Sequence, residues 1–206
     1  MVADNALAGI YIVRHGETEW SLAERHTGRT DVPLTPNGIE QVASLGDYLA
    51  KVEFSWVASS PLVRAQETCK LAGFNTPDLL DDLMEWDYGN YEGITLDQIR
   101  QSRPDWNLWT DGCPGGEGAA EIGERAKRVL ALAREHTGNV LLFSHGHFLR
   151  VLAACWLGMQ VSGGRLFALQ PAAVSVLAFE HDLPVISMWN LQADGLPRAA
   201  SSAKPS

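Results

Sequence analysis

The sequence predicts a single α/β domain of three layers, in which a mainly parallel sheet carries helices on both faces. Short apolar runs alternate with segments of helical periodicity along the chain, and this alternation is typical of a parallel sheet covered on both sides. The length of 206 residues suits one domain. We see no linker, internal repeat or low-complexity segment that would divide the sequence, so we treat residues 1–206 as one unit.

The first half of the chain contains two expected strands, each followed by a helix. Residues 10–13 form the first strand, and Thr35 and Pro36 supply an N-cap and a first helical residue. Residues 56–59 form the second strand, after which a helix opens at Ser60 and Pro61. Helical spacing assigns two buried faces: Ile39, Val42, Ala43, Gly46, Leu49 and Ala50 on the first helix, and Leu62, Ala65, Cys69 and Ala72 on the second.

The second half repeats this order and ends in a closing antiparallel hairpin. A strand is expected over 140–143, and the hairpin over 174–179 and 185–188, with Pro184 on the turn side. We expect an ordered core over about 9–190 and flexible ends at 1–8 and 199–206. The helices before and after the 140–143 strand bury Ile122, Ala126, Val129, Leu130 and Ala133, and then Phe148, Val151, Leu152 and Cys155.

Composition and charge exclude several classes of partner. The formal net charge is −9, whereas a surface for nucleic acid or anionic membrane requires a basic face, so we expect neither. The N-terminus carries Asp4 and lacks the apolar region of a secretory signal, and the longest apolar stretch, 151–157, is far shorter than a membrane span. We therefore expect a cytoplasmic protein and leave a homodimer open.

The cysteines indicate neither a disulfide framework nor a zinc site. Cys69, Cys113 and Cys155 are odd in number and show no C-x-x-C spacing. Cys69 and Cys155 fall on apolar helix faces, so we expect them in the core. We expect no bound metal and no cofactor.

Charged residues at two strand ends indicate where the chemistry takes place. Arg14 and His15 follow the first strand directly, and His145 follows the strand at 140–143. Ligands of open α/β sheets bind at the carboxyl ends of strands. A guanidinium matches phosphoryl oxygens, and a neutral imidazole can attack phosphorus. The pattern predicts a phosphate pocket with a histidine nucleophile, although a structural histidine at a strand end is the alternative for His15 alone.

Four segments, in this order, resemble the histidine phosphatase superfamily and its phosphoglycerate-mutase-like fold. They are 14–18 (Arg-His-Gly-Glu-Thr), 59–68, 84–89 and 144–147, and the resemblance covers about 9–189. It implies that His15 forms a phosphohistidine and that Glu85, rather than the neighbouring Asp87, protonates the leaving group. It further implies that the phosphoryl oxygens are surrounded by Arg14, Arg64 and His145.

Loop segments narrow the resemblance to members like sedoheptulose bisphosphatase and related acid phosphatases. Ser21 and His147 stand where family mutases usually carry Asn, and Gly118 replaces a Ser that often follows Glu117, which leaves the orienting role of Glu117 open. A simple turn is an equal alternative for Thr27 and Gly28. The substrate contacts that the resemblance implies are Ser21, His26, Thr27, Gly28, Tyr88, Gly146, His147 and Arg150.

The tryptophans are mostly expected in the core. Trp106 and Trp109 lie in a polar stretch beside Arg100 and Arg103, where the family builds its substrate lid. A lid over a sugar phosphate is therefore the alternative for these two residues.

The leading interpretation is a metal-independent phosphatase that hydrolyses small phosphorylated metabolites, such as sugar phosphates or bisphosphates. A cofactor-dependent phosphoglycerate mutase is the first alternative. Family mutases carry a longer, basic insertion between the acid and the second histidine, and the short stretch from Glu85 to His145 favours hydrolysis. A non-catalytic module that binds phosphorylated ligands is the second alternative. Such modules usually lose the nucleophile or the acid, whereas His15 and Glu85 are both present.

Overall fold

The computed structural model describes residues 6–192, and a six-stranded sheet of order β3-β2-β4-β1-β5-β6 forms its centre. The strands β1 to β4 are parallel where they pair, whereas β5 runs antiparallel to β1 and to β6. This arrangement confirms the predicted α/β class and the closing hairpin. The strands are β1 (Leu7–Arg14), β2 (Phe54–Ser59), β3 (Asp78–Leu79), β4 (Gly138–Ser144), β5 (Val174–Glu180) and β6 (Leu183–Leu191).

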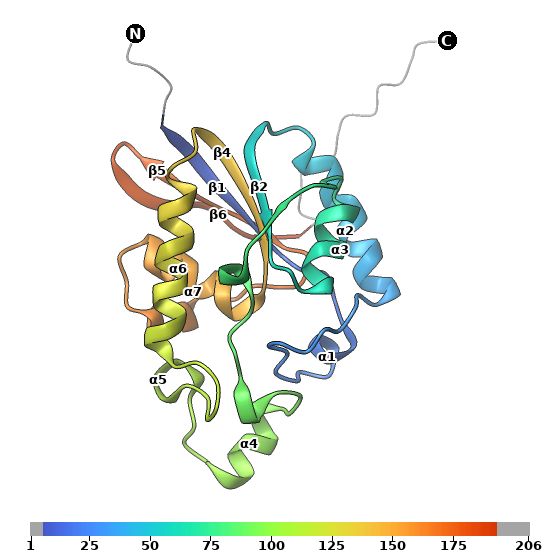
Figure 1. Cartoon of the computed structure of the whole chain (residues 1–206), viewed down its shortest axis with the longest axis vertical. Coiled ribbons are helices and arrows are strands. Elements are labelled where there is room, and N and C mark those ends of the chain that lie inside the picture. Colours follow the sequence, from blue (N-terminus) through green and yellow to red (C-terminus); the bar gives the residue numbers. More distant parts are fainter. Residues whose placement is uncertain (1–5, 193–206) are drawn as a thin grey trace.

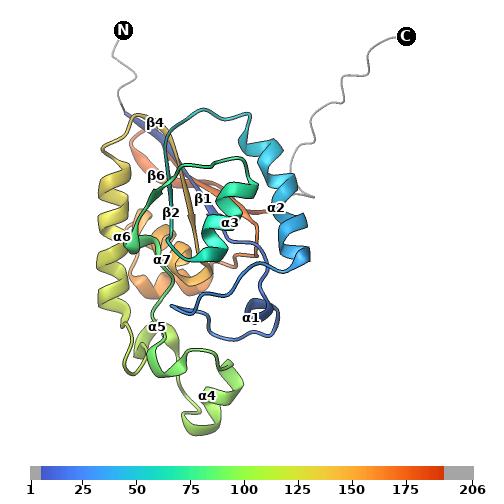
Figure 2. The same ribbon diagram turned by 45° about the vertical axis from the view of Figure 1, so that its right-hand side comes forward.

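Two pairs of helices cover the two faces of the sheet (Figures 1 and 2). Helices α2 (Pro36–Leu49) and α3 (Val63–Leu71) pack on one face, and α6 (Ala119–Ala133) and α7 (Gly146–Trp156) pack on the other. The short helices α1 (Glu19–Leu22), α4 (Leu96–Ser102) and α5 (Leu108–Asp111) lie beyond the carboxyl ends of the parallel strands, at the lower end of Figure 1. Three short 3₁₀ helices complete the described fold: η1 (Asp81–Leu83), η2 (Gly89–Tyr91) and η3 (Val161–Leu166).

The central strands read as continuous apolar runs because both of their faces are buried. Successive side chains of a strand point to opposite faces. Ile10 and Ile12 accordingly join the core under α6 and α7, whereas Val13 joins the core under α2 and α3. In β4, Leu142 and Phe143 divide between the two cores in the same way.

Helix α2 begins as predicted but buries a different face. Thr35 accepts a hydrogen bond from the Gly38 N–H, and Pro36 is the first helical residue. The buried residues are Gly38, Val42, Leu45 and Leu49, whereas Ile39 is 44% exposed and Ala43 and Ala50 are also exposed. The expected face is therefore wrong at these three positions. The cause is tertiary: Gly38 packs so tightly on Glu17 that a Cβ would lie 2.3 Å from the Glu17 carbonyl oxygen.

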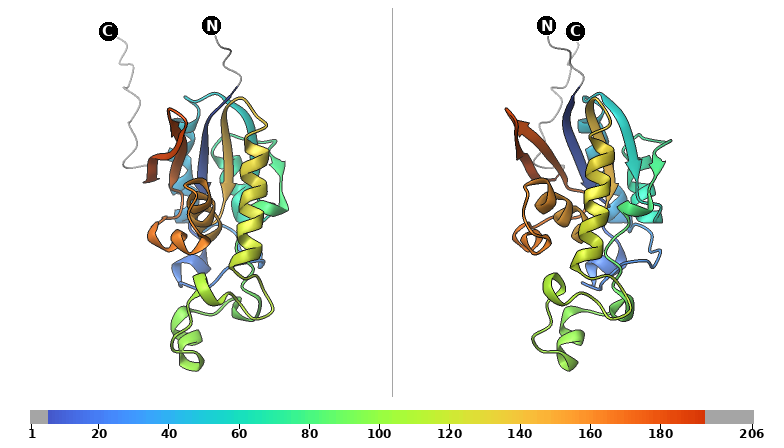
Figure 3. Two further views of the ribbon diagram at one scale, coloured as in Figure 1. Left: turned by 90° about the vertical axis from the view of Figure 1, so that its left-hand side faces the viewer. Right: turned by 60° about the vertical axis from the view of Figure 1, so that its left-hand side comes forward.

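The chain ends and the hairpin differ from expectation in detail. Residues 7 and 8, which we expected to be flexible, belong to β1, where Leu7 pairs with Gly138. Ala6 is also described, and its carbonyl oxygen accepts from the Gly138 N–H at 3.0 Å, whereas 1–5 and 199–206 lie outside the described part of the chain. Pro184 lies within β6, opposite Phe179, and it is tolerated there because β6 is an edge strand (Figure 3).

The cysteines lie mostly inside, and so do the two tryptophans for which a lid is the alternative. Cys69 is buried, and its burial raises the pKa of the thiol to about 12. Cys155 is only half-buried, so its assignment to the core is partly wrong. Trp106 and Trp109 belong to the core beneath α7 rather than to an exposed lid. Within residues 6–192, no helix is both long enough and apolar enough to cross a membrane.

Candidate active site

A cavity of about 190 Å³ opens beside the end of β1 and the start of α7. Most of the predicted site residues line it: Arg14, His15, Ser21, His26, Thr27, Glu85, Tyr88, Gly146, His147 and Arg150. Arg64, His145 and Gly28 are not part of this lining. Three lining residues escaped prediction, namely Glu24, Arg25 and Leu169. Glu24 and Arg25 stand between two predicted contacts, Ser21 and His26, and Leu169 lies between η3 and β5. No local pattern shows that these three side chains face the cavity.

His15 is buried at the end of β1 with a defined tautomer. Its Nδ1 lies 2.7 Å from the Gly16 carbonyl oxygen. Because a carbonyl only accepts, Nδ1 carries the proton and Nε2 keeps a free lone pair. Burial holds the pKa of His15 well below its usual value, and the charges of Arg64 and Arg14 lower it further. The imidazole is therefore neutral near pH 7, as a nucleophile must be.

Arg14 presents an unused donor beside this ring. Its Nη1 donates to the Leu169 carbonyl oxygen, whereas its buried Nε finds no acceptor within residues 6–192. A Cβ on Gly146 would lie 3.3 Å from Arg14 Nε. Glycine at position 146 thus allows the first turn of α7 to approach the guanidinium closely.

Arg64 and His145 form a buried layer that contacts His15. The His15 and His145 ring centroids are 5.2 Å apart. Arg64 Nε donates to His145 Nδ1 at 3.2 Å, so the His145 proton lies on Nε2, 2.8 Å from Ser60 Oγ. Burial and then the charge of Arg64 hold the pKa of His145 well below its usual value. The remaining contacts of Arg64 are to main-chain carbonyls of Thr27, Gly28 and Thr30, at 3.1, 2.9 and 2.9 Å.

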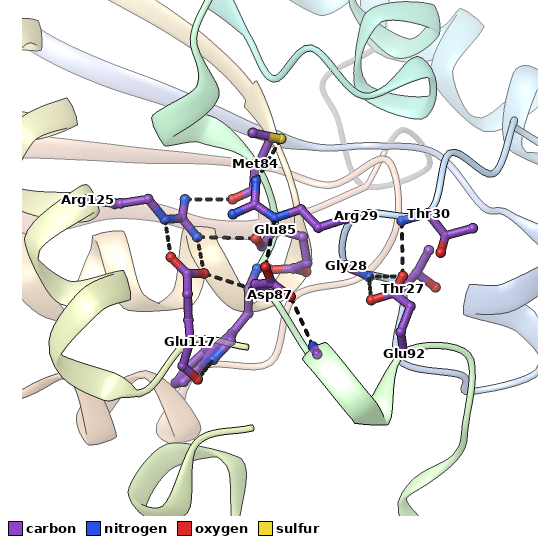
Figure 4. A network of polar contacts seen from close by, with 12 residues as sticks. Thr27, Gly28, Arg29, Thr30, Met84, Glu85, Asp87, Glu92, Glu117 and Arg125 are labelled. Atoms are coloured by element: carbon purple, nitrogen blue, oxygen red, sulfur yellow. Dashed lines mark hydrogen bonds and ion pairs between the residues drawn. The ribbon is translucent and has the colours of Figure 1, made fainter. Parts of the chain in front are cut away.

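Gly28 supports this layer instead of facing the cavity. Its N–H donates to both carboxylate oxygens of Glu92, at 2.9 and 3.0 Å, and the Thr30 N–H donates to the same carboxylate at 3.1 Å (Figure 4). A Cβ on Gly28 would lie 2.7 Å from the Trp86 carbonyl oxygen. Glu92 therefore holds the loop whose carbonyls bind Arg64. Sequence reasoning missed Glu92, since a single glutamate in a loop carries no signal.

Glu85 reaches the cavity, whereas Asp87 does not line it. Glu85 Oε1 accepts from the N–H groups of Trp86 and Phe148 at 2.9 and 2.8 Å, and Oε2 accepts from the His147 N–H at 3.0 Å. Two of these donors belong to the first turn of α7, where helical N–H groups have no partner within the helix. Asp87 instead lies 3.5 Å from Arg29 Nε and accepts from the Gly89 N–H.

Aromatic and histidine side chains form the opposite wall. The Tyr88 hydroxyl lies 2.7 Å from His147 Nδ1, and burial, followed by the charge of Arg150, holds the pKa of His147 well below its usual value. His26 Nδ1 donates to the Ile94 carbonyl oxygen at 2.8 Å, which leaves His26 Nε2 as an acceptor. The Arg150 guanidinium lies 4.6 Å from the centre of the Trp109 ring. Trp109 thus packs against the Arg150 side chain of this wall.

The two hydroxyl residues of the lining are engaged by the main chain. Ser21 Oγ donates to the Thr18 carbonyl and accepts from the Thr18 N–H, both at 2.9 Å, and so closes the capping box of α1. Thr27 Oγ1 donates to the Arg25 carbonyl at 3.0 Å. Over the part of the chain that the structure describes, no group of three or more His, Cys, Asp or Glu side chains is arranged to hold a metal ion.

Comparisons with known proteins show which proteins this chain resembles in sequence and in fold. The chain is 42% identical to an acid phosphatase of Mycobacterium tuberculosis over 195 residues, which cover 93% of this chain and 96% of that protein. It is 37% identical to the sedoheptulose 1,7-bisphosphatase of Saccharomyces cerevisiae over 183 residues, covering 73% and 68% of the two chains. A solved structure of an open reading frame from M. tuberculosis superposes with a TM-score of 0.86 at 40% identity, covering 90% and 98%.

The family comparison confirms the predicted resemblance. The model of the histidine phosphatase superfamily, branch 1, matches residues 10–192. This match runs from within β1 to the end of β6. The chain therefore belongs to the histidine phosphatase superfamily.

Proposed function

We propose that this protein is a phosphoric monoester hydrolase of the histidine acid phosphatase type, which cleaves small phosphorylated metabolites through a phosphohistidine on His15. One observation carries the proposal. His15 and Arg14 both line the cavity; His15 has its Nδ1 proton committed to the Gly16 carbonyl, and the buried Arg14 Nε has no acceptor within residues 6–192. This pairing of a nucleophile with an unused cationic donor suits a phosphoryl group.

The reaction takes two steps. In the first, His15 Nε2 attacks phosphorus, the bond from phosphorus to the ester oxygen breaks, and Glu85 gives that oxygen a proton. In the second, water attacks phosphorus, the bond from phosphorus to Nε2 breaks, and the carboxylate of Glu85 takes the proton from water. Arg14 binds phosphoryl oxygens. Arg64 and His145, which form the buried layer against His15, add to the binding of the phosphoryl group. The products are an alcohol and inorganic phosphate.

The remaining wall suits a polyhydroxylated ester. Tyr88, His147 and His26 offer donors and acceptors to hydroxyl groups, and Arg25 and Arg150 offer charge to a second anionic group. The likeness to an acid phosphatase and a sedoheptulose bisphosphatase supports sugar phosphates or bisphosphates as the substrate class. A cytoplasmic location and a homodimer stay predictions.

A screen of substrates tests the proposal against the mutase alternative. We expect free phosphate to be released from sugar mono- or bisphosphates, and little 2-phosphoglycerate to form from 3-phosphoglycerate primed with 2,3-bisphosphoglycerate. Fast formation of 2-phosphoglycerate, with negligible phosphate release from every sugar ester, would overturn the proposal. No turnover and no phosphoenzyme with any ester would favour a binding module.

The His15→Ala variant tests the nucleophile. The side chain works at a cavity, so we expect turnover to be lost with the fold intact, a fall of at least about 10³ in kcat/KM. Wild type incubated with labelled substrate should carry acid-labile, base-stable phosphate on His15. Undiminished hydrolysis by the variant would exclude this role.

Exhaustive chelation tests the expected metal independence. Arg14 and Arg64 supply positive charge to the phosphoryl oxygens, which is the contribution that a metal ion makes in other phosphatases. We expect kcat/KM to change by less than about twofold after treatment with EDTA. A loss of activity that added Mg²⁺ restores would contradict this expectation.

A further inference from the structure

The residue proposed as the acid stands on a segment without regular structure. Residues 84–88 connect the turns η1 and η2 and form neither helix nor strand. A catalytic group must be held to within about 0.5 Å of its productive position. The main chain around Glu85 therefore needs partners from elsewhere in the fold.

Arg125 of helix α6 supplies three of these partners. Its side chain is 9% exposed. Arg125 Nη1 donates to the carbonyl oxygen of Met84 at 2.9 Å, and Nη2 donates to the carbonyl oxygen of Glu85 at 3.2 Å (Figure 4). Nη1 also donates to the carbonyl oxygen of Asp82 at 2.8 Å. A single guanidinium thus binds the main chain before and at the acid.

Glu117 completes the arrangement on the far side of Glu85. Arg125 Nε and Nη2 donate to its two carboxylate oxygens at 2.6 and 2.7 Å, so all five N–H groups of the guanidinium have acceptors. Glu117 Oε2 also accepts from the Asp87 N–H at 2.9 Å, and the Glu117 carbonyl accepts from Trp86 Nε1 at 2.9 Å. The ion pair is therefore hydrogen-bonded to this segment on both sides of Glu85.

Stability alone is a weak explanation for this pair. Replacing a buried ion pair by apolar residues is often neutral or stabilising. Burial acts to raise the pKa of Glu117, but hydrogen bonds from Arg125 and from the Asp87 N–H lower it below its usual value. The Glu117 carboxylate therefore stays charged where it accepts the hydrogen bond from the Asp87 N–H.

We propose that the Glu117–Arg125 pair positions the general acid, holding the main chain at 84–87 so that the carboxyl group of Glu85 faces the cavity. The inference rests on the proposed function, because it assumes that Glu85 protonates the leaving oxygen. Neither Glu117 nor Arg125 lines the cavity. Both act through Glu85 and are positioning residues.

The dependence of the rate on the leaving group provides the test. An alkyl ester, glycerol 3-phosphate or the best sugar phosphate of the screen, needs its departing oxygen protonated, whereas p-nitrophenyl phosphate needs little help. The comparison uses kcat/KM, which includes the step that expels the leaving oxygen. The variants are Arg125→Lys, Glu117→Gln and the double variant Arg125→Met/Glu117→Gln, which leaves no buried charge unpaired.

Arg128→Met is the matched control. Arg128 lies on the same helix and binds the Asp82 carboxylate at 2.7 Å, but its side chain is 58% exposed. It contacts the side chain of Asp82 and none of the main-chain carbonyls that Arg125 binds. We expect Arg128→Met to match wild type on both esters.

We expect Arg125→Lys to lower kcat/KM for the alkyl ester by about 10- to 100-fold and for the aryl ester by less than about threefold, since general acids contribute about 10²- to 10⁴-fold. When Glu85→Gln is already present, adding Arg125→Lys should cause no further loss that distinguishes the two esters. Glu117→Gln should act in the same direction. If the single variants do not fold, the double variant gives the same comparison.

Two outcomes would overturn the positioning role. One is an equal loss on both esters, and the other is a full effect of Arg125→Lys in the Glu85→Gln background. If these appear while Glu85→Gln itself discriminates between the esters, the proposed function stands and only the positioning role fails. If wild type forms no phosphohistidine, or Glu85→Gln slows both esters equally, the proposed mechanism fails and the inference fails with it.

Discussion

Gly146 begins helix α7 with its backbone against the Arg14 guanidinium. A Cβ there would lie 3.3 Å from Arg14 Cζ and Nε, which is closer than ordinary contact. Arg14 has little freedom to retreat, since its Nη1 donates to Leu169. We expect Gly146→Ala to lower kcat/KM by about tenfold through displacement of the guanidinium, with little change in the melting temperature. Steady-state kinetics and thermal unfolding measure the two effects. An unchanged kcat/KM would mean that Arg14 adjusts freely.

At the scale of single residues, the sequence predicts the cavity residues that directly follow strands better than the cavity residues that lie on loops. Arg14 and His15 are fixed by the end of β1, and their neighbourhood follows from the strand itself. Arg25 and Leu169 reach the cavity from a loop and from a segment near the C-terminus. Their proximity is a property of the tertiary fold, which no local pattern encodes.

At the scale of elements, the loop at 27–30 shows how one carboxylate can act at a distance. Glu92 binds the N–H groups of Gly28 and Thr30, and the carbonyls of the same loop bind Arg64. Glu92→Gln leaves one accepting oxygen in place of two and removes the charge. Hydrogen bonds to a charged group contribute about 1.5–3 kcal/mol, so we expect the free energy of unfolding to fall by about that amount. We expect kcat/KM to fall by about tenfold because Arg64 loses its fixed position.

Enzyme kinetics and denaturant unfolding of Glu92→Gln measure both effects. Glu40→Gln is the control, since Glu40 is exposed on α2. A loss of stability without any change in kcat/KM would assign Glu92 to the fold alone.

Helix α2 shows which part of an element local sequence determines. Thr35 and Pro36 specify its start through cap geometry and a fixed φ angle, which are local effects. The buried face depends instead on the contact of Gly38 with Glu17, which belongs to the packing of α2 against the loop after β1. Strand β3 escaped prediction because its two residues are exposed and show no periodicity.

At the scale of the whole molecule, three histidines, two buried and one half-buried, make stability depend on pH. His15, His145 and His147 each have a folded-state pKa well below the ordinary 6.5, mainly because of burial. Between those lowered values and 6.5, the unfolded chain binds more protons than the folded one, so stability falls as pH falls. Each histidine contributes up to about 1.4 kcal/mol per pH unit in that window.

Denaturant unfolding between about pH 8 and pH 5 measures this dependence. We expect the free energy of unfolding to decline as the pH drops below about 6.5. His147→Asn should reduce the slope of the free energy of unfolding against pH by the contribution of about one bound proton. His181→Asn, in the exposed turn between β5 and β6, is the control and should leave the slope unchanged. An identical slope in wild type and His147→Asn would contradict the argument.

The global architecture was the most predictable level. Apolar runs with no polar alternation indicate strands that are buried on both faces. This pattern predicts the three layers that Figure 1 shows. The acidic net charge of −9 was equally informative. It implies that the cationic groups of the cavity act on an anion by contact and not through a long-range field.

The unused donor on Arg14 links folding to the reaction product. A buried N–H without an acceptor costs the folded state about 1–3 kcal/mol, and within residues 6–192 Arg14 Nε has none. Any anion that accepts from it stabilises the fold by an amount that grows with the logarithm of the ratio of its concentration to its dissociation constant. Inorganic phosphate qualifies as well as the substrate does. Where phosphate is abundant, we expect the protein to resist heat better and to turn over more slowly, so that abundance of the product would both protect the enzyme and restrain it.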